Sequence, residues 1–252
     1  MTRIWLAADY HFPATYSCRI PMSSANHATV TPAPGPATVR LALIRTAIEL
    51  FGLGFVRDKL FASICSLRVL IKPPERVAIT PHRLRALKWE AVEKGKQDRV
   101  LESVVVREIA HAQGHMTVYL EIPLQEEVLY RQILQTIGYW GQTSSFACCV
   151  RITHETPQPW TYALPLSDVR STEPLQPLFI SLLTEFRKPD LTWQEVAPVF
   201  HVNQRKAFRL DIYVWPMIVE RKQNGSQILV RRRLDEKTAG NTSHEKRQER
   251  RP

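Results

Sequence analysis

The stretch from residue 116 to residue 153 constrains the fold more than any other part of this chain. Apolar and polar residues alternate over 116–123, which predicts a strand, and apolar residues recur at helical spacing over 124–136, which predicts a helix. A turn with two glycines follows at 137–146, and an apolar run at 146–153 predicts a second strand. The order strand, helix, turn, strand indicates a mixed α and β fold.

The N-terminal part of the chain predicts another strand and helix. Residues 3–10 form a short, aromatic, partly alternating apolar run, and the proline-rich residues 17–36 predict a surface loop. Apolar residues then recur at helical spacing over 37–52. Pro36 suits the first turn of that helix and Gly52 suits its C-terminal cap, so the boundary signals agree with the periodicity.

A further strand is predicted over residues 61–71, which alternate loosely before Pro73-Pro74, with a short partner strand at 77–80. Counted along the chain, the elements then follow the order strand, helix, strand, strand, helix, strand. This order is that of the split βαβ arrangement, so we expect an α+β, ferredoxin-like (RRM-like) domain over residues 1–153. A sheet of this kind is also a platform for RNA recognition.

Residues 81–115 differ in character from the segments around them. They have weak periodicity and carry many basic side chains around one aromatic residue, Trp89: His82, Arg83, Arg85, Lys88, Lys94, Lys96, Arg99 and Arg107. Basic side chains neutralise phosphates and an aromatic ring stacks on a base, so this composition suits single-stranded nucleic acid. The alternative is a solvated insertion with no ligand.

The turn at residues 137–146 has the composition of a phosphate-binding corner. Gly138 and Gly141 flank Tyr139 and Trp140, and a run of hydroxyl side chains follows. Glycine lets a ligand approach the main chain, and free amides and hydroxyls bind phosphate oxygens. The alternative is a tight connection between helix and strand with both aromatic rings packed in the core.

Charge and composition restrict the partners of the protein. The chain has 252 residues, 44% of them hydrophobic, and a formal net charge of +10, which favours a polyanionic partner, either nucleic acid or an acidic membrane surface. The most apolar region is interrupted by charges, and residues 1–10 lack the pattern of a signal peptide. We therefore expect an intracellular, cytoplasmic protein without a membrane span.

Metal and cofactor signatures are absent from the sequence. The cysteines at 18, 65, 148 and 149 fit no zinc spacing, which predicts buried free thiols, and Gly114 separates His111 from His115. No Walker loop, dinucleotide fingerprint, metalloprotease motif or nucleophile elbow can be recognised. We therefore expect neither a metal nor a cofactor.

Residues 154–234 predict a second, mainly β subdomain. An apolar segment at 178–186 and a short helix near Thr192 precede two strands at 208–220 and 226–234. Asn224-Gly225 between these strands is a strong hairpin signal, and Pro216 makes the first strand an edge or bulged strand. Residues 235–252 have nothing apolar to bury, so a disordered basic tail is expected.

The chain resembles the Cas-five family of CRISPR-associated RAMP proteins in three features. These are the proline-rich loop that leads into the start of a helix at 36–43, the basic insertion, and the turn at 137–146. One departure is Val39-Arg40-Leu41-Ala42-Leu43, where family members often carry glycine before the Ala-Leu pair. The resemblance implies an RNA-binding subunit of a type I CRISPR surveillance complex (Cascade) that grips the 5′ handle of the guide RNA. It also implies that a thumb, residues 81–115, contacts backbone subunits of the Cas-seven type, in a complex with a large subunit and target DNA.

Two functional classes follow from these residues. The first is a non-catalytic RNA-binding subunit, with handle contacts expected from Arg40, Arg83, Arg85, Lys88, Trp89, Tyr139, Trp140, Gly141, Gln142, Ser144 and Arg151. The second is a metal-independent endoribonuclease, which needs a base to activate a 2′-hydroxyl and an acid to protonate the leaving oxygen, roles that a histidine with a tyrosine or lysine can fill. The residues available for it are His11, His27, His82, His111, His115 and Tyr139, but no spacing singles out a catalytic pair. A third reading keeps the basic charge and replaces RNA with DNA or a membrane surface.

Overall fold

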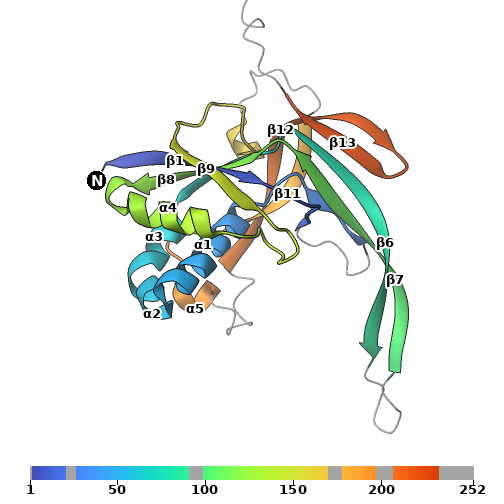
Figure 1. Ribbon diagram of the computed structural model, residues 1–252, viewed down its shortest axis with the longest axis horizontal. Helices are drawn as coiled ribbons and strands as arrows, with labels where there is room; N and C mark the ends of the chain where they lie inside the picture. The colour runs from blue at the N-terminus through green and yellow to red at the C-terminus, as the bar shows by residue number, and fades with distance from the viewer. Residues whose placement is uncertain (1, 21–26, 91–98, 170–177, 197–206, 233–252) are drawn as a thin grey trace, which may run out of the picture.

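The computed structural model describes residues 2–20, 27–90, 99–169, 178–196 and 207–232 (Figure 1). Its first sheet has four strands in the order β5-β8-β1-β9, and every neighbouring pair is antiparallel. The strands are β1 (Arg3–His11), β5 (Arg68–Lys72), β8 (Met116–Pro123) and β9 (Cys148–His154). The strands expected near the N-terminus and at 116–123 are therefore confirmed.

The helices α1 (Pro36–Phe51) and α4 (Glu127–Thr136) belong to the same buried core as one face of this sheet. Leu6, Ala8 and Tyr10 alternate along β1 and are fully buried, so they define the face of the sheet that packs on the helices. The predicted caps of α1 are confirmed. Pro36 starts the helix, and Gly52, with a φ of 82°, donates its N–H to the carbonyl of Ile48 at 2.9 Å.

A second sheet contains the mid-chain insertion. The strands β6 (Arg76–Glu90) and β7 (Arg99–Gln113) pair along their whole length, and Figure 1 shows this hairpin extending away from the rest of the molecule. The base of β6 also pairs with β13 (Ser226–Arg231), which pairs with β12 (Phe208–Gln223). The insertion and the C-terminal strands are thus parts of one sheet.

The C-terminal segment adds β10 (Leu164–Pro165) and β11 (Leu178–Phe186), both paired with β12. The hairpin prediction is confirmed, because both turn residues have the positive φ that the turn needs: 51° at Asn224 and 80° at Gly225. The pairing of β11 with β12 shifts register around Pro216, which is the bulge that this proline predicts. The predicted short helix is α5 (Trp193–Val196).

One hydrophobic core contains residues from both sheets, including Tyr10 of β1 and Trp215 of β12. The boundary predicted near residue 154 falls in the connection between β9 and β10, and this core continues across it. The predicted tail, 235–252, lies outside the described residues. No helix in the described part of the chain is long and apolar enough to cross a membrane.

Two local predictions are wrong. Residues 61–71 do not form one strand: the first part is helix α3 (Phe61–Ser66), which follows α2 (Leu53–Phe55) and a π-helical turn (Val56–Leu60). Phe61, Ile64 and Cys65 of α3 are buried, and their spacing of three and four residues is helical. The loose alternation over 61–71 concealed this pattern.

The proline-rich stretch at 17–36 is not a plain surface loop. It contains β2 (Cys18–Arg19), β3 (His27–Ala28) and β4 (Val30–Thr31), and β3 pairs in parallel with β7. Thr31 is buried, and its hydroxyl shares its one hydrogen between the carbonyls of Ala33 at 2.6 Å and Cys18 at 3.1 Å. A polar, proline-rich segment can be buried here because its hydrogen-bonding groups find partners inside the protein.

Candidate nucleic-acid interface

The connection between α4 and β9, residues 137–147, is a closed turn, here called the α4–β9 turn. Trp140 N–H donates to the carbonyl of Ser145 at 3.1 Å, and Ala147 N–H donates to that of Gly138 at 3.0 Å. Gly141 has a φ of 72°, a conformation in which other residues are strained. The exposed residues Gly141 and Ser144 lie at the tip, so the turn presents its amides and hydroxyls to solvent.

The two aromatic residues of this turn face the protein. Trp140 is fully buried, and its ring meets that of Tyr10 edge to face at 4.8 Å. Tyr139 is half-buried, and the guanidinium carbon of Arg45 on α1 lies 3.5 Å from the centre of its ring. The alternative of a core-packed connection therefore holds for Trp140, which has no ring face left for a base. Phe146 of the same turn is 58% exposed and is the most exposed of its three aromatic rings.

Residues 16–19, here called the bridging segment, join the α4–β9 turn to the base of the β6–β7 hairpin. On one side, the buried Ser145 hydroxyl accepts the N–H of Ser17 at 3.0 Å. On the other side, Tyr16 and Ala110 of β7 exchange two backbone hydrogen bonds of 2.8 Å. The turn and the hairpin, far apart in the sequence, are thus connected through the adjacent residues Tyr16 and Ser17.

Arg19 is the charged residue of the bridging segment. The side-chain amide of Gln142 satisfies both its oxygen and its nitrogen when the oxygen faces Arg19. In this orientation the oxygen accepts hydrogen bonds from Arg19 Nε at 2.7 Å and Nη2 at 3.0 Å. The pKa of the Arg19 guanidinium is lowered, chiefly by partial burial and also by the positive charge of Arg107 on β7. Neither arginine has an acidic partner in the described part of the chain. Two cations near each other without a carboxylate favour an anion.

The hairpin carries basic side chains on both faces. Arg83 and Arg85 are exposed on one face of β6, opposite Val106 and Val104 of β7. Arg107 lies opposite His82 and therefore on the other face. The structure thus does not bring Arg83 and Arg85 together with Arg107. Lys88 and Trp89 belong to β6, but their side chains lie outside what the structure describes.

The face of the first sheet opposite the helices carries Arg151, which forms a two-point ion pair with Asp9 at 3.1 and 2.6 Å. These hydrogen bonds to the Asp9 carboxylate raise the pKa of Arg151. His11 lies two positions after Asp9 on β1 and therefore on the same face of the sheet. Its ring meets that of His115 edge to face, with ring centres 5.9 Å apart. Both histidines are exposed.

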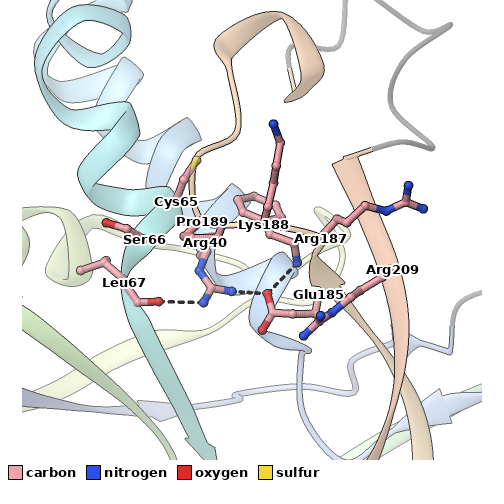
Figure 2. Close-up of a pocket in the computed structure, with 10 residues that line it drawn as sticks. Arg40, Cys65, Ser66, Leu67, Glu185, Arg187, Lys188, Pro189 and Arg209 are labelled. Carbon is pink, nitrogen blue, oxygen red and sulfur yellow. Dashed lines mark hydrogen bonds and ion pairs between the residues drawn. The ribbon is translucent and has the colours of Figure 1, made fainter.

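Arg40 has its partners inside the protein. Its guanidinium pairs with Glu185 of β11 and donates to the carbonyl of Leu67 at 2.7 Å (Figure 2). It lines a cavity of about 270 Å³ and is only 8% exposed. We therefore remove Arg40 from the expected handle contacts.

The sequence did not single out Arg19, Arg107 or Phe146 as contact residues. Arg19 lies in a proline-rich stretch without periodicity, where helix and strand patterns give no guidance. The sequence did contain one signal for Arg19. It is the only acidic residue, lysine or arginine between Asp9 and Arg40. Within the described residues, no three His, Cys, Asp or Glu side chains gather closely enough to hold a metal ion.

Solved CRISPR structures share a low overall similarity with this chain. A crystal structure of a CRISPR protein from Archaeoglobus fulgidus covers 90% of this chain and 91% of its own, with a TM-score of 0.48 and 13% identity. A chain of a CRISPR RNA-guided surveillance complex covers 84% of this chain and 88% of its own, with a TM-score of 0.35 and 11% identity.

Sequence comparison gives a closer relationship over a shorter stretch. No family model matches the sequence. A CRISPR-associated protein Cas5 of Archaeoglobus fulgidus is 33% identical over 84 residues, which are 33% of this chain and 37% of the relative. The match thus spans little more than a third of the relative's length. Over that stretch the chain is similar to a Cas5 protein, which confirms the resemblance to the Cas5 family that its motifs indicate.

Proposed function

We propose that this chain is a non-catalytic RNA-binding subunit of a type I CRISPR surveillance complex, in which it holds the 5′ handle of the guide RNA. The observation that carries the proposal is the junction of the α4–β9 turn with the base of the β6–β7 hairpin. There, among the residues that the structure describes, Arg19 and Arg107 have no acidic partner, and Gly141 and Ser144 are exposed. The net charge of +10 supports a polyanionic ligand.

The topology supports assigning residues 1–153 to the ferredoxin-like class. The strand order β5-β8-β1-β9, with α1 after the first strand and α4 after the third, is the order that a split βαβ arrangement requires. In this proposal the β6–β7 hairpin is an insertion between the second and third strands of the domain.

The hairpin suits the role of a thumb that contacts backbone subunits of the Cas-seven type. Leu87 and Val104 are 71% and 65% exposed, and they share the face of Arg83 and Arg85. Exposed aliphatic groups beside arginines are typical of the surface that another macromolecule covers. The large subunit and target DNA belong to the same proposed complex, which we place in the cytoplasm.

The experiment is to express the chain with its genomic neighbours, purify the assembly through a tag on this subunit, and sequence the RNA it carries. Short RNAs with one common 5′ sequence, still processed when this subunit is omitted, would support handle binding. Recovery of no discrete RNA would contradict it. Recovery of DNA or lipid alone would favour the third reading instead.

A second candidate function, metal-independent cleavage of CRISPR repeat RNA, is favoured by the His11–His115 pair. One imidazole can take the proton of a 2′-hydroxyl while the other protonates the leaving 5′ oxygen. The two rings are close enough to act on one phosphodiester. Cleavage of repeat RNA in EDTA by the purified chain, abolished by His11→Ala and by His115→Ala, would establish this function. An intact RNA under those conditions would exclude it.

A further inference from the structure

Arg19 and Arg107 come from distant parts of the sequence and meet around one short segment. On β2, Arg19 lies opposite Val30 of β4, and on β7, Arg107 lies opposite Ala28 of β3. Residues 28 and 30 are separated by one position, so both arginines flank the same piece of backbone. Val30 is fixed to β7 because its N–H donates to the carboxylate of Glu108 at 2.9 Å.

The contact between Arg19 and Gln142 orients the guanidinium without neutralising it. An amide oxygen accepts hydrogen bonds as a carboxylate does, but it carries no charge. Gln142 uses Nε and one N–H of Nη2, so within the described residues the N–H groups of Nη1 and the second N–H of Nη2 remain for another acceptor. Gln142 is itself held in the α4–β9 turn, where its carbonyl accepts the N–H of Ser145 at 2.9 Å. Arg19 is therefore positioned by the protein while its full charge remains.

The nearest carboxylate on β7 does not compensate the two cations. Glu108 follows Arg107 directly, so its side chain leaves the strand on the opposite face, and it is occupied by the N–H of Val30. The Arg19–Arg107 pair is thus a site of like charge with an uncharged orienting group. Guanidinium groups bind phosphate oxygens in a fork-like geometry, and a shared anion removes their mutual repulsion.

We propose that Arg19 and Arg107 together hold a single phosphodiester of the bound RNA, and that Gln142 is the positioning residue that presents Arg19 to it. This inference rests on the proposed RNA-binding function and goes beyond it by naming one phosphate and its two ligands. The bound phosphate would lie between the α4–β9 turn and the base of the hairpin, which fixes where the RNA passes over the protein.

The test measures RNA affinity of the purified full-length chain against salt concentration. The probes are a synthetic RNA with the common 5′ sequence of the copurified RNAs and an oligouridylate of equal length. Arg19→Gln and Arg107→Gln are each expected to weaken binding by roughly tenfold or more, as for a lost charge-assisted hydrogen bond. Arg57→Gln is the matched control, because Arg57 is exposed and pairs only with the neighbouring Asp58 in the described structure.

The double variant distinguishes one shared phosphate from two separate ones. For single strands the slope of log K against log salt falls by about 0.7 for each phosphate contact that is lost. If both arginines hold one phosphate, the slope of log K against log salt falls by about 0.7 in the double variant. The fold-loss of RNA affinity in the double variant is then smaller than the product of the fold-losses in the two single variants. A fall of about 1.4 with multiplicative losses would overturn the proposal.

Neutral methylphosphonate linkages, placed one at a time in the handle RNA, locate the phosphate. One linkage is expected to weaken binding to the unsubstituted chain and to have no further effect on the double variant. If no linkage behaves so, the inference is wrong even though the chain binds RNA. If the unsubstituted chain binds neither probe, the proposed function fails and the inference fails with it.

Discussion

The guanidinium of Arg40 on α1 forms a buried ion pair with the carboxylate of Glu185 on β11. The two side chains are only 10% and 13% exposed, and Glu185 also accepts the N–H of Phe186 at 2.6 Å. The pair therefore ties the helix that covers the first sheet to a strand of the second sheet (Figure 2). Arg40 thus has a structural role in joining the two halves of the molecule.

Glu185→Gln is expected to destabilise the protein, because it leaves the buried charge of Arg40 without a counter-charge. Removing one partner of a buried pair lowers the free energy of unfolding by about 3–5 kcal/mol. Urea unfolding measures this loss, and the double variant Arg40→Met, Glu185→Leu is expected to recover most of it. Glu49→Gln, which removes the exposed partner of Arg45, serves as control, and an equal effect in both variants would contradict the prediction.

Trp140 is expected to act on stability rather than on RNA binding. Trp140→Ala removes a fully buried ring and should lower the free energy of unfolding by about 3–5 kcal/mol, whereas Trp140→Phe should cost less. If the ring stacked on a base, Trp140→Phe and Trp140→Leu would differ in RNA affinity by roughly tenfold or more. We expect equal RNA affinity for the two folded variants, measured by fluorescence anisotropy.

Gln142→Glu is expected to weaken RNA binding while leaving the fold intact. A carboxylate at this position keeps the contact with Arg19 but neutralises its charge and repels phosphate. Gln142→Ala removes the contact without adding a charge, so it serves as the control. Binding titrations at low salt should give the weakest affinity for the glutamate variant, and the opposite order would show that Arg19 does not meet the RNA.

Burial raises the pKa of the Cys18 thiol to about 12 and that of Cys65 to about 12. In the folded protein these thiols stay protonated near pH 9, where cysteines of the unfolded chain begin to ionise. Their contribution to stability is therefore complete below about pH 8.5 and is lost as pH rises toward 12. Urea unfolding at pH 7, 9 and 10.5 should show a falling free energy of unfolding.

Alkylation provides an independent measurement of the same thiols. Iodoacetamide at pH 8 should label the exposed Cys148 of the native protein and spare Cys18 and Cys65, with all four cysteines labelled in urea. Mass spectrometry of tryptic peptides gives the extent at each site. Rapid labelling of Cys18 in the native protein would show that β2 opens readily.

Local signals in the sequence predicted most of the elements correctly. Pro36 and Gly52 bound α1 where a helix of this pattern should begin and end, and Asn224-Gly225 forms the expected hairpin turn. These predictions succeed because the information lies within a few residues: proline lacks an amide, and glycine accepts a positive φ. The loose alternation at 61–71 failed because an apolar run can satisfy two periodicities at once.

The candidate site was only partly predictable. The sequence directed attention to the turn at 137–146 and to the basic insertion, which the structure connects through Tyr16 and Ser17, but it also placed the buried Trp140 and Arg40 among the ligand contacts. Arg40 lies off the apolar stripe of α1, and on an isolated helix it would be solvated. It is buried because β11, more than 130 residues later in the chain, packs against that side of the helix.

The sequence by itself determined the helices α1 and α4, the strands β1, β8 and β9, the caps of α1, the C-terminal hairpin and the excess of positive charge, since each depends on neighbouring residues or on composition. Only the tertiary structure decided which cations remain available to a ligand. Arg40 meets a carboxylate across the two sheets, whereas Arg19 meets the uncharged Gln142 and the like charge of Arg107. Whether an arginine is neutralised depends on groups distant in sequence that the fold brings within a few ångströms, and no local pattern records them.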